Sequence, residues 1–116
     1  MRSRLLDVTN DFNTNNGVKL DVSEWESATC CFVTPSGTIS ITGTNDGGAI
    51  EGVTDGNATL SANYSTIQAI NLATGTAVTS VSTAGNYKIT VGTKYIQLGG
   101  ASAAATKVLV QLTTPY

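Results

Sequence analysis

Short runs in which apolar and polar residues alternate constrain this chain more than any other feature. In the run NYKITV, Tyr87, Ile89 and Val91 share one phase, whereas Lys88 and Thr90 occupy the other. Successive side chains of a β-strand point to opposite faces, so this spacing predicts a strand with one buried and one exposed face. We interpret the run as scaffold: its apolar phase packs inward, and its polar phase faces water or a neighbour.

The same alternation returns along the chain, with Gly, Pro, Asn and Asp residues between the runs. About eight strands separated by turn signals predict an all-β, antiparallel β-sandwich that is jelly-roll-like. Helices that alternate with strands, as a parallel α/β sheet requires, are not indicated. The inward-facing phase predicts a core of Val18, Leu20, Val22, Phe32, Ile39, Ile41, Ile67, Ile70, Leu72, Tyr87, Ile89, Val91, Ile96, Leu98, Val108, Val110 and Leu112.

Composition excludes several classes of function. Charged residues make up 12% of the 116 residues, the net charge is −2 and the six basic residues are scattered, so we expect no nucleic-acid partner. No run approaches the roughly 18 apolar residues that a membrane span needs, so we expect no membrane partner. The chain contains no histidine. A Ser-His-Asp triad, a Cys-His pair and a His-ligated metal site are therefore impossible within one chain.

The adjacent cysteines, Cys30 and Cys31, are predicted to be two reduced, packed thiols. Neighbouring Cα atoms lie about 3.8 Å apart, which is below the usual disulfide range of about 4.4–6.8 Å. Neighbouring side chains on a strand also point to opposite faces. Two cysteines alone cannot form a zinc site.

Acidic residues in the Gly-rich segment 44–59 form a possible calcium site. Asp46, Glu51 and Asp55 supply oxygen ligands on a loop, which is the right chemistry for calcium. Their spacing matches no EF-hand loop, and Asp-Gly is also a common hairpin turn. We therefore expect turns here, and no metal or cofactor.

Two carboxylates flank the single tryptophan: Glu24 and Glu26 lie on either side of Trp25. A paired acid and base beside an aromatic ring would suit a glycosidase. A chain of 116 residues without a larger cleft does not favour that activity, and we expect no enzyme. Non-catalytic glycan contact through Trp25 or Tyr64 is the alternative interpretation.

Residues 1–16 are predicted to form an N-terminal arm that precedes a sandwich domain over residues 17–116. The segment carries large apolar residues without a sustained period, and NTNNG then indicates a turn. A free terminus would fray, but so many apolar side chains favour docking on a neighbour. The predicted docking residues are Arg2, Arg4, Leu5, Leu6 and Phe12.

The runs WESATCCFVTPSGTISITGTNDGG and IQAINLATGTAVTSVSTAGNYKITVGTKYIQL resemble small β-sandwich proteins of tailed-bacteriophage virions, above all head decoration (auxiliary capsid) proteins. The resemblance covers about residues 17–112 and rests on the order of the elements. It implies a non-enzymatic protein, often a trimer, that binds the major capsid protein and stabilises the capsid. It carries over no catalytic or cofactor residue.

The resemblance therefore implies a virion structural protein that is made in the host cytoplasm and sits on the outer capsid surface. The alternative is a receptor- or glycan-binding module of a phage tail or fibre.

Overall fold

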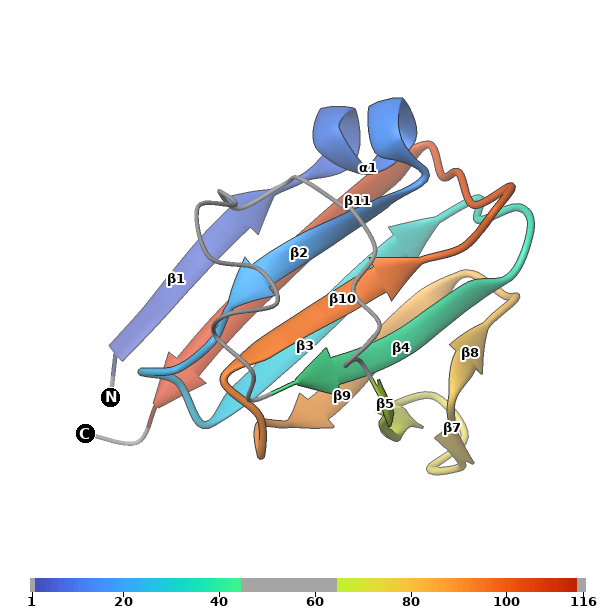
Figure 1. The fold of residues 1–116 in the computed structure, drawn as a ribbon. Coiled ribbons are helices and arrows are strands. Elements are labelled where there is room, and N and C mark those ends of the chain that lie inside the picture. Colours follow the sequence, from blue (N-terminus) through green and yellow to red (C-terminus); the bar gives the residue numbers. More distant parts are fainter. Residues whose placement is uncertain (1, 45–64, 115–116) are drawn as a thin grey trace.

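The computed structural model describes residues 2–44 and 65–114, which form eleven strands and one short helix (Figure 1). The elements in chain order are β1 (Arg2–Asp7), α1 (Thr9–Asn15), β2 (Gly17–Asp21), β3 (Ser27–Val33), β4 (Ile39–Thr44), β5 (Ser65–Thr66), β6 (Ala69–Asn71), β7 (Ala77–Val78), β8 (Ser80–Val81), β9 (Gly85–Thr90), β10 (Tyr95–Gly99) and β11 (Lys107–Thr114).

The strands form two antiparallel sheets that pack face to face. The sheet that contains β2, β10 and β4 lies in front in Figure 1. Sheet A has the order β1-β11-β3-β9-β6-β7. Sheet B has the order β2-β10-β4-β5, and β8 also pairs with β4. The predicted all-β antiparallel sandwich is therefore confirmed. The strands outnumber the predicted eight because several of them are only two or three residues long.

The core lies between the sheets and consists of the inward-facing phase of each long strand. In β11 the even-numbered residues Val108, Val110 and Leu112 are buried, as predicted. An aromatic row crosses the centre: the rings of Phe12 and Phe32 meet edge to face with centroids 6.0 Å apart, and those of Phe32 and Tyr87 do so at 6.1 Å. Edge-to-face pairs add about 1 kcal/mol each to the burial of the rings.

The prediction of a separate arm over residues 1–16 is wrong for the residues that the structure describes. β1 pairs with β11 along its whole length, from Arg2 opposite Thr114 to Asp7 opposite Leu109. The hydrogen bonds of a full strand ladder hold this segment in sheet A, so it is not a free extension. The sandwich therefore begins at Arg2.

Helix α1 connects the two sheets and lies over one end of the sandwich (Figure 1). Asn13 fastens it to the segment before β11: its amide Nδ2 donates to the Ala105 carbonyl at 2.7 Å, and the Ala105 N–H donates back to its Oδ1 at 2.9 Å. At the start of the helix, Thr9 Oγ1 accepts from the Val108 N–H at 2.9 Å. These bonds fix α1 so that Phe12 enters the core.

Candidate functional site

Apolar side chains gather on the outer face of sheet A. The exposed large hydrophobic residues of the described part of the chain are Leu5, Val33, Ile70 and Leu72, which are 66%, 40%, 40% and 51% exposed. Each of them stands on the outward phase of its strand or of the strand's continuation. Val33, for example, follows the buried Phe32 in β3. One face therefore carries all four of these side chains.

Strand register places the exposed residues in neighbouring rows across sheet A, with Leu5 and Ile70 at the two ends of one row. Leu5 faces Gln111, two residues along β11 from Leu109. Leu109 lies directly opposite Cys31, and both side chains are partly buried. Side chains two residues apart on a strand share a face, so Val33 follows Cys31 on the same side.

β9 interrupts the band, because its outward side chains Asn86, Lys88 and Thr90 are polar, and the apolar residues resume at β6. Asn86 of β9 faces Cys31 and accepts a backbone hydrogen bond from Leu72 at 3.0 Å. Ile70 lies two residues before Leu72 and opposite Lys88. We call this band the apolar stripe and define it as Leu5, Leu109, Cys31, Val33, Leu72 and Ile70.

Polar side chains also lie between residues of the apolar stripe. A row of directly paired residues crosses all six strands of sheet A: Leu5, Gln111, Thr29, Lys88, Ile70 and Ala77. The middle of this row is polar, so Gln111, Thr29 and Lys88 separate Leu5 from Ile70. Protein–protein contact surfaces contain such a mixture of apolar and polar side chains.

The charges on this face include Asp7 and Lys107 near one end. Two hydrogen bonds from Thr9, one from its hydroxyl at 2.6 Å and one from its backbone N–H at 3.1 Å, lower the pKa of the Asp7 carboxyl, and Lys107 lowers it further. Asp7 is therefore ionised at neutral pH. Lys88 is exposed among neutral neighbours.

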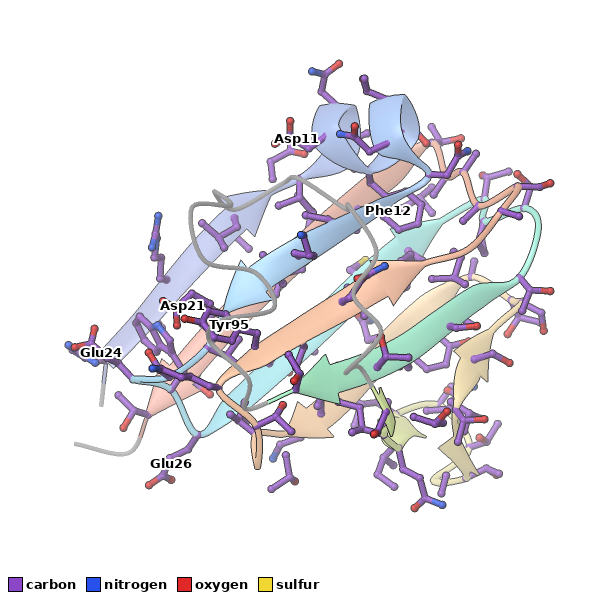
Figure 2. All side chains as sticks on the ribbon, in the orientation of Figure 1. Asp11, Phe12, Asp21, Glu24, Glu26 and Tyr95 are labelled. Atoms are coloured by element: carbon purple, nitrogen blue, oxygen red, sulfur yellow. The ribbon has the colours of Figure 1, made fainter. Side chains whose placement is uncertain are left out.

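The five residues predicted to dock on a partner have different surroundings. Leu5 lies on the apolar stripe, Arg2 and Arg4 are exposed, and Leu6 packs partly against the core. Phe12 is fully buried beneath α1 (Figure 2), so its prediction as a docking contact is wrong. Burial of the Phe12 ring in the core stabilises the fold, because it removes a large apolar surface from water.

The residues predicted for glycan contact do not form one site among the described residues. Tyr64 lies outside them. Trp25 is partly buried against the core, and the Arg2 guanidinium sits over its ring, 4.7 Å from the centroid. Beside it is an open groove of about 480 Å³, lined by Val22, Ser23, Trp25, Val91, Gly92, Thr93 and Lys94. One face of the only tryptophan is therefore already covered by a side chain of the same protein.

The carboxylates beside Trp25 do not form a pair. Glu24 and Glu26 are both exposed and extend in different directions from the turn between β2 and β3 (Figure 2). An acid–base pair for glycoside cleavage needs two carboxyl groups that face each other across a bond. The arrangement of Glu24 and Glu26 does not offer this.

The two cysteines are free thiols with different environments, which agrees with the predicted absence of a disulfide. Cys30 points into the core, and burial, together with the neighbouring Cys31, raises its pKa to about 12. Cys31 points outward and belongs to the apolar stripe. β3 is therefore buried on one face only.

The possible calcium ligands Asp46, Glu51 and Asp55 lie outside the described residues. Among residues 2–44 and 65–114, no three His, Cys, Asp or Glu side chains come close enough together to hold a metal ion. The helix of this part of the chain is too short and too polar to span a membrane.

The fold is similar to that in the crystal structure of SPBc2 prophage-derived protein YomS. The TM-score is 0.64 at 9% sequence identity, and the match covers 97% of this chain and 94% of that chain. At this identity the likeness establishes a shared fold. No protein-family model and no curated protein matches the sequence.

Sequence reasoning missed most of the apolar stripe. The predicted core leaves out Val33 and Leu109 and includes Ile70 and Leu72. The signal that was available is the alternation itself: Val33 is on the opposite phase from Phe32, and Leu109 from Val108 and Val110. An apolar residue on the polar phase of a strand indicates an exposed apolar contact.

Proposed function

We propose that this protein is a non-enzymatic structural protein of a bacteriophage virion, which binds the outer capsid surface through the apolar stripe. The observation that carries the proposal is the concentration of the exposed large hydrophobic residues on one sheet face. The fold shared with a prophage-derived protein and the sequence resemblance to head decoration proteins support it.

A sheet face suits attachment to a broad protein shell. Specific protein contacts bury about 800 Å² on each partner, and sheet A offers six adjacent strands on one side. Covering a half-exposed Ile70 or Leu72 contributes on the order of 1 kcal/mol. One face therefore binds weakly, and linked copies that share a high local concentration would hold the shell together.

The test measures binding to capsids of the phage that encodes this chain, prepared without this protein. The double variant Ile70→Thr, Leu72→Thr should weaken co-sedimentation roughly 10–100-fold, because both residues lose apolar contact area. Thr66→Ala on sheet B is the control and should bind as the wild type does. Unchanged binding by the folded double variant would overturn the docking face.

Glycan binding is the second candidate, and the groove beside Trp25 is the observation in its favour. A glycan array and the fluorescence of Trp25 on addition of sugar separate the two functions. Capsid binding with no glycan bound supports the decoration role, whereas a saturable fluorescence change that is lost in Lys94→Ala supports the glycan-binding module.

A further inference from the structure

Strand β1 is an edge strand whose outward backbone groups have no partner in the described structure. Val8 lies opposite Val108 in the continued register and donates its N–H to that carbonyl at 3.0 Å. Residues of an antiparallel pair alternate between bonded and non-bonded positions. The even-numbered residues of β1 therefore bond to β11, and the N–H and C=O groups of Ser3, Leu5 and Asp7 point away from the sheet.

This edge carries the charged residues Arg2, Arg4 and Asp7 but lacks the backbone features that normally block pairing. Edge strands are often protected by charged side chains, by proline, by a bulge or by short length. β1 has six residues in unbroken register with β11 and contains no proline. The corresponding edge of sheet B differs, because residues 17–20 of β2 are buried. The far edge of sheet A, β7, is only two residues long.

We propose that a second copy of this chain adds to sheet A through β1, in an antiparallel, two-fold arrangement. The register that the edge allows places Leu5 opposite the partner's Leu5, and Ser3 opposite the partner's Asp7. Leu5 is 66% exposed, so the two apolar side chains cover each other on the outer face. The ionised Asp7 carboxylate lies across from a serine hydroxyl that can donate to it.

The neighbouring registers are less favourable. Only Ser3, Leu5 and Asp7 direct their backbone N–H and C=O groups away from β11, so only these residues can bond to a second strand. A shift of register must therefore move the strand by an even number of residues. A shift in one direction sets Arg4 directly opposite the partner's Arg4, and like charges in that position repel. A shift in the other direction leaves Ser3 outside the pairing and shortens the ladder. Charge and ladder length therefore select the same register.

A two-fold pairing of this kind uses the β1 edge of both copies and closes at a dimer. The joined sheets also bring the two apolar stripes onto one surface, with the Leu5 pair at its centre. The contact between copies is small, so the dimer should form in a concentration-dependent way. It does not depend on capsid binding, and it is measured on the purified protein alone.

The experiment uses the position of Leu5 opposite its own copy. The mass of the wild type by light scattering should rise from 11.9 kDa towards twice that value between about 1 µM and 1 mM, the range in which small interfaces dissociate. Leu5→Lys and Leu5→Asp should each be monomeric, because like charges meet at the two-fold axis. An equimolar mixture of the two should restore the dimer, and added salt should weaken the restored dimer.

The control variant is Ile70→Thr, at the far side of sheet A, which should dimerise as the wild type does. Circular dichroism verifies that every variant is folded. Monomeric wild type across the whole concentration range, a trimer, or a mixture of folded charge variants that stays monomeric would each overturn the proposal. Capsid binding by a monomer would overturn only the pairing and leave the docking face intact.

Discussion

Replacing Phe12 by alanine tests whether the N-terminal segment belongs to the folded core. The side chain is fully buried and its ring contacts that of Phe32 edge to face. Truncating a buried phenylalanine costs about 3–5 kcal/mol, of which the ring pair accounts for about 1 kcal/mol. Domains of this size are stable by about 5–15 kcal/mol. We therefore expect the variant to fold, with a Tm lower by roughly 10–20 °C.

Urea unfolding followed by the fluorescence of Trp25 gives the free energy of unfolding directly. The matched control is Asn10→Ala, because Asn10 is exposed in the same helix. It should change the free energy of unfolding by less than about 0.5 kcal/mol. A Phe12→Ala variant as stable as this control would show that α1 does not pack in the core. That result would support the interpretation of residues 1–16 as a docking arm.

Two further predictions concern titratable groups. At pH 8, iodoacetamide should label Cys31 in the folded protein and leave Cys30 unmodified until urea is added, because Cys30 is buried with its pKa raised to about 12. Mass spectrometry counts the labels on each molecule. Rapid labelling of both cysteines in the folded protein would contradict the burial of Cys30. The pKa of Asp7 is lower in the folded state than its unfolded value of about 3.9, so its contribution to stability is present above that pH and is lost as the pH falls through the folded pKa. Asp7→Asn should therefore make stability less dependent on pH in the acid range, as measured by urea unfolding at a series of pH values, and an unchanged profile would show that the hydrogen bonds from Thr9 do not stabilise the ionised carboxylate.

Strict alternation made the long strands predictable from the sequence. Tyr87 and Ile89 share a phase, and both are buried in β9. The same reasoning identified Val108, Val110 and Leu112 as core residues of the last strand. These strands are long enough for a buried face to impose a period of two on the sequence, so local pattern and tertiary environment agree.

Helix α1 was not predictable because its sequence, TNDFNTN, does not favour a helix by itself. Asn, Thr and Asp have low helix propensity, and isolated helices as short as seven residues are unstable in water. The helix exists because Asn13 bonds to Ala105 at both ends of its amide and Phe12 fills the core. Ala105 and the core residue Phe32 are distant from α1 in sequence. The residues of the helix and their sequence neighbours therefore do not reveal why the helix forms.

The errors at Ile70 and Leu72 have a different origin and bear on function. Alternation shows which residues share a face, but it does not show which face meets the core. The assignment of Ile70 and Leu72 to the interior rested on the rule that the apolar phase is buried. In β6 the smaller Ala69 is buried instead, and it faces Val78 of β7, which packs partly against the core. A strand that buries alanine and exposes isoleucine gives up stability that the opposite phase would provide. The exposure of Ile70 and Leu72, and of Leu5 at the other end of the same face, therefore supports the proposed docking face.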